Sequence, residues 1–307
     1  MAKQRWTADL IPDQSGRIAV VTGGNSGIGY AAARALANAG AEVIIASRSQ
    51  QRGEYAVASI RAKGIGGPVR FLSLDLASLR SVRQFVAAFQ GRYDRLDLLI
   101  NNAGVMACPL TRTPEGWELQ FATNHLGHFL LTNGLKPALV AAGGARVVSL
   151  TSGGHRGSDV VFDDLHFERR EYEKWSGYGQ AKTANILFAV ELDRRWRGHG
   201  IRANAVHPGA ISTDLNRHLT EADMTALLAR IPGGKMPYKS LGAGAATSVW
   251  AATAPELADE GGHYLEDCHI GVVKQGGVTG VEPYAVDPAS ATRLWEISET
   301  LLGERFD

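Results

Sequence analysis

Tyr178 and Lys182 are the two residues whose types and spacing most directly suggest chemistry. They stand four positions apart at the start of a stretch with helical apolar spacing, so the phenol and the ammonium are expected on one face of a helix. A free tyrosine titrates near about 10, which makes it a poor proton donor to a carbonyl oxygen at neutral pH. A neighbouring positive charge favours the phenolate and lowers that pKa. Because a long helix can place two such common residues four apart by chance, other parts of the chain must decide.

Short β-rich runs alternate along the chain with segments of helical length. Six runs rich in Val, Ile or Leu are expected to be buried parallel strands: 17–22, 42–47, 69–74, 96–101, 145–150 and 202–207. The helical segments that follow or separate them are 27–38, 50–63, 78–90, 116–139 and 178–197. This alternation, without an interdomain linker, predicts an α/β fold. We expect a single doubly wound, Rossmann-type domain with a mostly parallel central sheet of about seven strands and helices on both faces.

The rhythm changes after residue 207. A polar segment at 214–230 favours a helix and is followed by a break at 232–234. A second helix is expected at 241–252, a last strand at 262–265 and a final helix at 288–302. The glycine-rich stretch 266–286 shows no clear period.

A glycine-rich turn follows the first expected strand and opens the first expected helix. Residues 22–29 read Thr-Gly-Gly-Asn-Ser-Gly-Ile-Gly. Glycines at such a position allow a tight turn and let backbone N–H groups approach a pyrophosphate at a helix N-terminus, where the helix dipole favours anions. The sequence therefore predicts dinucleotide contacts from Gly23, Asn25, Ser26, Gly27, Ile28 and Gly29.

The TGxxxGxG spacing of this turn resembles the short-chain dehydrogenase/reductase family. Asn101-Asn102-Ala103-Gly104, the Tyr178 to Lys182 motif and Pro208-Gly209 resemble further motifs of the same family, in its order, so that the resemblance covers about 16–252. Within the family, segments 123–129 and 178–185 are most similar to the branch of retinol dehydrogenases, WW-domain oxidoreductases and light-dependent protochlorophyllide reductases.

The chemistry that such a site performs needs a proton donor and a second group that fixes a carbonyl oxygen. Tyr178 is the candidate acid/base. Ser152 is the candidate that orients the oxygen, because it follows the strand expected at 145–150 and ligands bind outside the carboxyl ends of parallel strands. Ser149 and Thr151 are rival hydroxyls nearby, and the resemblance favours Ser152.

The resemblance also implies roles for Lys182 and Asn124. Lys182 would lower the pKa of Tyr178 and hydrogen-bond the nicotinamide ribose. The side chain of Asn124 would help to hold a water that links the lysine to solvent. This second role rests on the resemblance alone.

The end of the second strand indicates which cofactor is bound. An NAD site would place a carboxylate there to bind the ribose 2′-hydroxyl, whereas this chain has Ser47 followed by Arg48, so NADP(H) is favoured over NAD(H). The turn lacks the additional basic residue of many NADP-binding relatives. Asp75 resembles the family's adenine-contacting aspartate and is also compatible with a turn role. The resemblance implies further cofactor contacts from Leu76, Asn102, Ala103, Gly104, Tyr178, Lys182, Pro208, Gly209, Ile211 and Thr213.

These residues predict an oxidoreductase that transfers a hydride between NADP(H) and a carbonyl or secondary alcohol, a carbonyl reductase or alcohol dehydrogenase. An NAD-dependent alcohol dehydrogenase is an alternative, as is an NADP(H)-binding regulatory protein without turnover, although the intact Tyr178 and Lys182 disfavour the latter. A sugar-nucleotide epimerase or dehydratase usually carries TGxxGxxG, which is not the spacing here. A light-dependent protochlorophyllide reductase is a narrower alternative within the branch.

The substrate is expected to lie under the segment 214–240. Apolar residues there would wall a pocket for a bulky apolar carbonyl compound, or they simply pack a lid helix: Leu215, Leu219, Met224, Leu227, Leu228 and Met236. We expect one domain over 1–307, with an N-terminal extension at 1–15 and a C-terminal extension at 266–307.

Composition and charge exclude several other classes. With 32 Lys and Arg against 31 Asp and Glu, the formal net charge is +1, so no nucleic-acid partner is expected. Cys108 and Cys268 have no CxxC spacing, and His125 and His128 lack an HExxH glutamate, so neither a disulfide framework nor a metal is expected. Without an apolar signal core or an 18-residue apolar run, the chain is expected to be cytoplasmic, with no membrane anchor. Family members are commonly homodimers or homotetramers, and the sequence does not choose between these.

Overall fold

The central sheet has eight strands in the computed structural model, which describes residues 6–64, 66–229 and 234–306. Their order across the sheet is β3-β2-β1-β4-β5-β6-β7-β8, and all neighbours pair in parallel except β7 and β8. The strands are β1 (Ile18–Thr22), β2 (Glu42–Ser47), β3 (Val69–Ser73), β4 (Leu98–Asn101), β5 (Arg146–Leu150), β6 (Arg202–His207), β7 (Tyr264–Glu266) and β8 (His269–Ile270). The step from β3 back through β1 to β4 places a topological switch point beside β1, where doubly wound sheets bind ligands.

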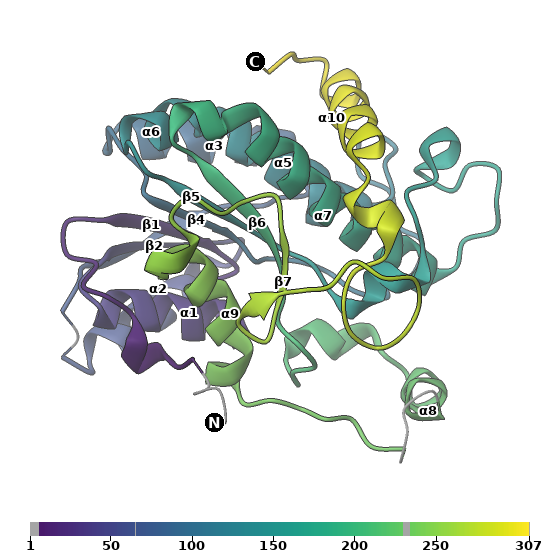
Figure 1. The fold of residues 1–307 in the computed structure, drawn as a ribbon, viewed down its shortest axis with the longest axis horizontal. Coiled ribbons are helices and arrows are strands. Elements are labelled where there is room, and N and C mark those ends of the chain that lie inside the picture. Colours follow the sequence, from purple (N-terminus) through teal and green to yellow (C-terminus); the bar gives the residue numbers. More distant parts are fainter. Residues whose placement is uncertain (1–5, 65, 230–233, 307) are drawn as a thin grey trace.

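Helices cover both faces of this sheet (Figure 1). One face carries α1 (Gly27–Asn38), α2 (Gln50–Arg61) and α9 (Leu241–Thr253). The other carries α3 (Leu79–Gln90), α5 (Gly127–Gly134), α6 (Lys136–Ala141), α7 (Lys174–Trp196) and α10 (Pro288–Leu302). Each face has its own apolar cluster, because the fully buried parallel strands present Val, Ile and Leu to both sides. The predicted doubly wound α/β domain is confirmed.

The eighth strand is the difference from the predicted sheet of seven. β8 has two residues and pairs antiparallel with β7 through Leu265 and Ile270. A strand that short, in a glycine-rich stretch, carries no alternation of apolar and polar residues from which it could be predicted. The expected end of a helix at residue 230 and the expected break at 232–233 lie outside the described residues.

The helical segment predicted over 116–139 is confirmed in large part, but it is not one regular helix. The chain forms α4 (Leu119–Phe121), a π-helical segment η2 (Ala122–Leu126), then α5 and α6. A Cβ on Gly127 would lie 2.2 Å from the Leu76 carbonyl oxygen. The helix backbone therefore lies against the loop that follows β3, at the point where the π-helix ends. Pro137 is the second residue of α6, in the first turn, where the N–H that proline lacks has no partner within the helix. π-helical turns of this kind occur frequently at functional sites.

α7 begins four residues before the predicted start at Tyr178. Glu173 caps it by accepting hydrogen bonds from the backbone N–H groups of Trp175 and Ser176. Tyr178 therefore lies in the second turn of a helix whose end is already fixed, which restrains the phenol more than a helix terminus would.

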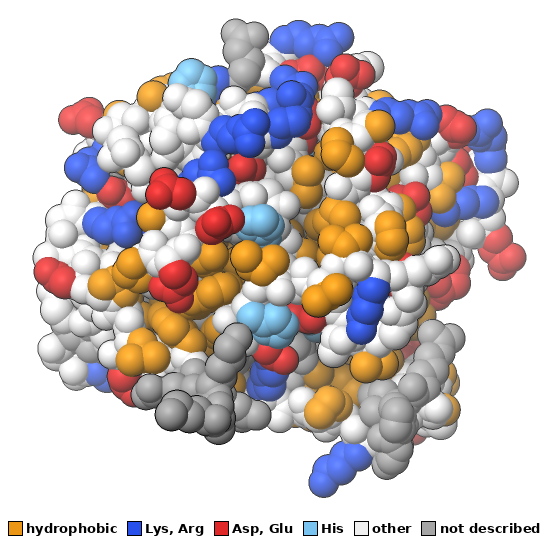
Figure 2. All heavy atoms as spheres, in the orientation of Figure 1, with side chains coloured by type: hydrophobic (Ala, Val, Ile, Leu, Met, Phe, Trp, Pro, Cys, Tyr) orange, Lys and Arg blue, Asp and Glu red, His pale blue; other side chains and the backbone are white. Residues whose placement is uncertain are grey.

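The surface bears mixed charge. On the face shown in Figure 2, basic and acidic side chains lie side by side, and hydrophobic side chains form patches between them. This agrees with the formal net charge of +1. None of the helices in 6–64, 66–229 and 234–306 is both long and apolar enough to cross a membrane.

Candidate active site

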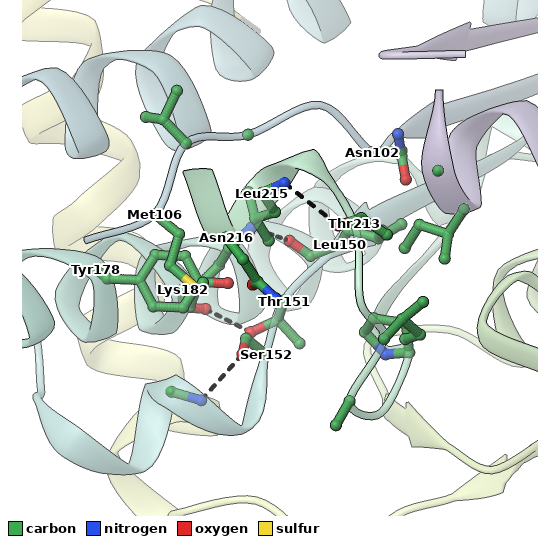
Figure 3. Close-up of a pocket in the computed structure, with 18 of the residues that line it drawn as sticks. Asn102, Met106, Leu150, Thr151, Ser152, Tyr178, Lys182, Thr213, Leu215 and Asn216 are labelled. Carbon is green, nitrogen blue, oxygen red and sulfur yellow. Dashed lines mark hydrogen bonds between the residues drawn. The ribbon is translucent and has the colours of Figure 1, made fainter. Parts of the chain in front are cut away.

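A cavity of about 1320 Å³ opens at the carboxyl ends of the strands (Figure 3). Its lining comes from the β1–α1 turn, the ends of β2 to β6 and the segment that follows β6. Every residue predicted to contact a cofactor lines it, and so do Ser152, Tyr178 and Lys182. Asn124 is fully buried behind the lining. The fold thus brings residues from 23 to 213 to one place.

The turn at residues 22–29 has backbone angles and close contacts that only glycine accommodates. Gly23 and Gly27 adopt φ of +65° and +56°, which side chains other than hydrogen rarely tolerate. A Cβ on Gly29 would lie 2.4 Å from the Asn102 amide nitrogen and 2.5 Å from the Gly23 carbonyl oxygen. Ser26, the N-cap of α1, makes no side-chain capping bond, so the first N–H groups of the helix are open to an anion.

Two buried hydroxyls in the lining have no hydrogen-bond partner within the described part of the chain. They are Ser47 Oγ, at the end of β2, and Thr123 Oγ1, in η2. An unpaired buried hydroxyl is costly, so a polar ligand that bonds both would stabilise the site. Thr123 was not predicted, because in the sequence it looks like any threonine within a helix. The donors, the glycine cradle and the orphaned hydroxyls fit a dinucleotide.

Basic side chains flank the end of β2. Arg48 and Arg52 are exposed and line the cavity, and the first turn of α2 contains no acidic residue. Ser49 caps α2 by accepting a hydrogen bond from the Arg52 N–H. The turn itself carries no further basic residue, as expected from the sequence, but Arg52, in the first turn of α2, adds a second guanidinium to the cavity lining.

Hydrogen bonds distinguish Ser152 from its rivals. Thr151 Oγ1 donates to the Lys182 carbonyl oxygen at 2.8 Å, and Ser149 Oγ donates to the Asn185 carbonyl oxygen at 3.0 Å. Both hydroxyls therefore hold β5 against α7. Ser152 Oγ accepts from the Gly154 N–H at 3.1 Å, and its own hydrogen points into the cavity, toward the Tyr178 phenol. Of the three hydroxyls, Ser152 has the donor that a substrate oxygen needs.

The environment of Tyr178 and Lys182 differs from the prediction. Both side chains are buried, and Lys182 Nζ lies 5.7 Å from the centre of the tyrosine ring while donating to the Leu150 carbonyl oxygen at 3.0 Å. Burial raises the pKa of Tyr178 to about 12, with a hydrogen bond from Ser152 acting in the opposite direction. Burial also lowers the pKa of Lys182 to about 8. The expected lowering of the tyrosine pKa by the lysine is therefore not found, since loss of water around the phenol outweighs the neighbouring charge.

Asn124 uses its side chain to hold the backbone. Its Oδ1 accepts from the Val105 N–H at 2.8 Å, and its Nδ2 donates to the Val105 carbonyl oxygen at 2.9 Å. The carboxamide predicted to hold a water is thus engaged with Val105, and it fastens the segment after β4 to η2. A Cβ on Gly104 would lie 3.0 Å from Asn124 Oδ1 and 3.7 Å from Lys182 Nζ, so this contact lies close to the ammonium.

The segment after β6 forms one side of the cavity. Leu215, Leu219, Met224, Leu227 and Met236 line it as predicted, whereas Leu228 does not. α8 (Glu221–Ala229) is tied to the start of α7 by the Lys174–Asp223 ion pair, at 2.6 Å between Nζ and Oδ2. Gly277, Val278 and Thr279, from the stretch without a clear period, also line the cavity.

His125 and His128, for which no metal is expected, contact other buried groups. His125 Nε2 lies 2.8 Å from Ser298 Oγ, and His128 contacts Thr22 and Asn124. Across the described ranges no group of three or more His, Cys, Asp and Glu side chains is arranged to hold a metal.

The chain resembles known proteins over most of its length. Residues 17–224 match the family described as "short chain dehydrogenase". A Streptomyces lividans protein described as a "probable oxidoreductase" is 47% identical over 292 residues, 92% of this chain and 97% of that protein. Human retinol dehydrogenase 13 is 40% identical over 289 residues, 94% of this chain and 85% of that protein.

Solved structures share the fold. An uncharacterised protein from Mycobacterium paratuberculosis has a TM-score of 0.76 and 35% identity, over 99% of this chain and 100% of that one. Pseudomonas aeruginosa RhlG, solved with NADP, has a TM-score of 0.67 and 27% identity, over 83% of this chain and 95% of that one. The chain belongs to the short-chain dehydrogenase family and is an oxidoreductase of its retinol dehydrogenase-like branch.

Proposed function

We propose that the protein reduces a carbonyl group, or oxidises the corresponding secondary alcohol, with NADP(H) as the hydride carrier. The observation that carries this proposal is the meeting of Ser152, Tyr178 and Lys182 in one cavity with the glycine turn (Figure 3). The Ser152 hydroxyl hydrogen-bonds the Tyr178 phenol, so a substrate oxygen that enters beside this pair would meet both hydroxyl groups.

The protein's own groups would handle the proton. When bound, the nicotinamide supplies or accepts the hydride. Ser152 donates a hydrogen bond to the substrate oxygen and polarises the carbonyl. Tyr178 gives its phenolic proton to that oxygen in reduction and takes it back in oxidation. Because the pKa of the phenol is raised to about 12, the ground state holds the proton, and its release to the substrate oxygen needs stabilisation of the phenolate.

Lys182 supports this transfer from a buried position. Its ammonium faces the tyrosine ring and stabilises negative charge that develops on the phenol as the proton leaves. With a pKa of about 8, Lys182 itself releases a proton readily near neutral pH. We therefore assign it the return of the proton to Tyr178 as well as the contact with the cofactor ribose.

The preference for NADP(H) rests on the end of β2. Arg48 and Arg52 offer two guanidinium groups, and Ser47 offers an unpaired hydroxyl, where an NAD site would have a carboxylate. RhlG, a structural neighbour, was solved with NADP, which supports the same assignment. A 2′-phosphate would lie between the arginines at the N-terminus of α2.

A bulky apolar substrate fits the side formed by segment 214–240. Its leucines and methionines, together with Met106 and Trp175, give an apolar wall beside Tyr178. We propose that this segment covers the substrate and that 1–15 and 266–307 are extensions of one domain over 1–307. The human relative named retinol dehydrogenase 13 is consistent with an apolar substrate of this kind.

Purified protein should be mixed with NADPH, or NADH, and a panel of apolar ketones and aldehydes, following loss of the reduced nicotinamide. We expect turnover with NADPH that falls at least about a hundredfold in Tyr178→Phe, since a positioned proton donor contributes about 10²–10⁴ in rate. Ser149→Ala is the matched control for Ser152→Ala, because Ser149 holds β5 to α7 and does not line the cavity. Full activity in Tyr178→Phe would overturn the assignment.

A further inference from the structure

Thr22 and His128 form a buried chain of hydrogen bonds behind the cavity. Thr22 Oγ1 accepts from the backbone N–H groups of Asn102 and Ala103, at 2.9 Å each. His128 Nε2 lies 2.9 Å from the same oxygen, and His128 Nδ1 lies 2.9 Å from the Asn124 carbonyl oxygen. Thr22 and His128 are 0% and 2% exposed, and neither lines the cavity.

The geometry determines which atom holds each hydrogen. A carbonyl oxygen only accepts, so His128 Nδ1 must donate to Asn124. In a neutral imidazole Nε2 is then an acceptor, and Thr22 Oγ1 donates to it. Burial lowers the pKa of His128 to about 4, which keeps the ring neutral. The Ile100 carbonyl oxygen is a second acceptor near Thr22 Oγ1, but at 3.4 Å it is farther away than His128 Nε2 at 2.9 Å, so the hydroxyl hydrogen goes to the histidine.

This chain connects two parts of the site that are distant in sequence. At one end, Asn102 and Ala103 line the cavity beside the glycine turn, and Asn102 Nδ2 also donates to the Thr22 carbonyl oxygen at 2.7 Å. At the other end, η2 carries Thr123 on the cavity and Asn124, whose Oδ1, like Lys182 Nζ, lies beside the Cβ position of Gly104.

We infer that His128 is a positioning residue that couples the cofactor-binding turn to η2 through Thr22 and the Asn124 carbonyl group. Cofactor contacts on the turn and the placement of η2 beside Lys182 then depend on the same hydrogen bonds. The inference rests on the proposed function, and it adds a residue outside the cavity that affects both cofactor affinity and turnover.

His125, three residues before His128, provides a contrast. It is equally buried in η2, but its Nε2–H donates to Ser298 Oγ, whose own hydrogen goes to the Leu294 carbonyl oxygen. That link leads to α10, away from the cavity. Ser298→Ala removes a buried hydrogen bond of the same kind from the same segment without touching the turn, and it is the matched control.

The test compares Thr22→Val, Thr22→Ser, His128→Phe, the double variant Thr22→Val/His128→Phe and Ser298→Ala. The dissociation constant of NADPH is measured by nucleotide fluorescence, which needs no turnover, and KM and kcat are measured with the best ketone. We expect Thr22→Val and His128→Phe each to weaken NADPH binding and lower kcat by about tenfold, about 1.4 kcal/mol, the worth of one buried hydrogen bond. Thr22→Ser, which keeps the hydroxyl, should retain wild-type values.

The double variant decides between coupling and unrelated damage. Because both changes break one chain, it should lose no more than the worse single variant, whereas independent effects would multiply to about a hundredfold. Ser298→Ala should change thermal stability, while the dissociation constant of NADPH and kcat stay within about twofold of wild type. Multiplying effects, or equal kinetic losses in Ser298→Ala, would overturn the coupling. If His128→Phe does not fold, the comparison of Thr22→Val with Thr22→Ser decides on the same readouts. Wild-type protein that binds no NADPH would refute the proposed function instead.

Discussion

Replacing Lys182 with methionine should stabilise the protein while abolishing its activity. Lys182 is 4% exposed, and burial lowers the pKa of its ammonium from 10.5 to about 8. Since a tenfold change in an equilibrium corresponds to about 1.4 kcal/mol, the folded state holds this charge at a cost of about 3 kcal/mol. Methionine has a similar length and carries no charge. The hydrogen bond lost to the Leu150 carbonyl oxygen leaves no orphan, because Asn185 Nδ2 also donates to that oxygen at 2.8 Å.

The pH dependence follows from the sign of the shift. Below pH 8 the lysine is protonated in both folded and unfolded chains, so the cost of burying the charge is fully present. Between pH 8 and 10.5 the folded chain has released the proton and the unfolded chain has not, so the stability of the wild-type protein rises with pH relative to the variant. Above 10.5 both are neutral and the difference should vanish.

Urea unfolding of wild type and Lys182→Met at pH 7 and at about pH 10 checks this prediction. At pH 7 we expect the free energy of unfolding of the variant to exceed that of wild type by about 3 kcal/mol. Most of this difference should be lost at the higher pH. The variant should show no measurable turnover at either pH. Lys63→Met is the control, because Lys63 is exposed and its replacement should change neither value. A variant no more stable than wild type at pH 7, or an advantage independent of pH, would refute the reasoning.

Three other changes test the site and the core. Arg52→Ala should raise KM for NADPH about tenfold and leave KM for NADH unchanged, since the guanidinium would meet only the 2′-phosphate; equal changes for both cofactors would contradict this. Gly29→Ala should abolish nucleotide binding in a fluorescence titration, because its Cβ would lie 2.4 Å from the Asn102 amide nitrogen. Trp295→Ala should lower the free energy of unfolding by about 3–5 kcal/mol, because the ring is 1% exposed and packs on Phe129 in the core between α5, α7 and α10.

Much of the fold follows from local patterns that the sequence carries. Strand β6 and helix α10 occur at the predicted residues, because buried strands read as apolar runs and α10 begins at Pro288 after the Asp287 cap. The helix predicted over 116–139 lacks its π-helical turn, because this turn ends where Gly127 approaches the Leu76 carbonyl oxygen, a contact between segments 51 positions apart that no local pattern records.

The site divides in the same way. Residue types and spacing indicated the glycine turn, Ser152, Tyr178 and Lys182, because each belongs to a short motif that can be recognised from neighbouring residues in the sequence. The orphaned hydroxyl of Thr123 and the link from Thr22 through His128 to Asn124 were not predictable, since they depend on which buried groups meet across the sheet.

The protonation properties of Tyr178 and Lys182 show this most clearly. By its spacing alone, the sequence determined that a phenol and an ammonium share one helix face, and the structure keeps them there. It did not determine the direction of their pKa shifts, because desolvation depends on how completely the surrounding elements exclude water. Only the tertiary structure, by burying both groups beneath the cavity, decided that the tyrosine holds its proton more tightly and the lysine less tightly than in water.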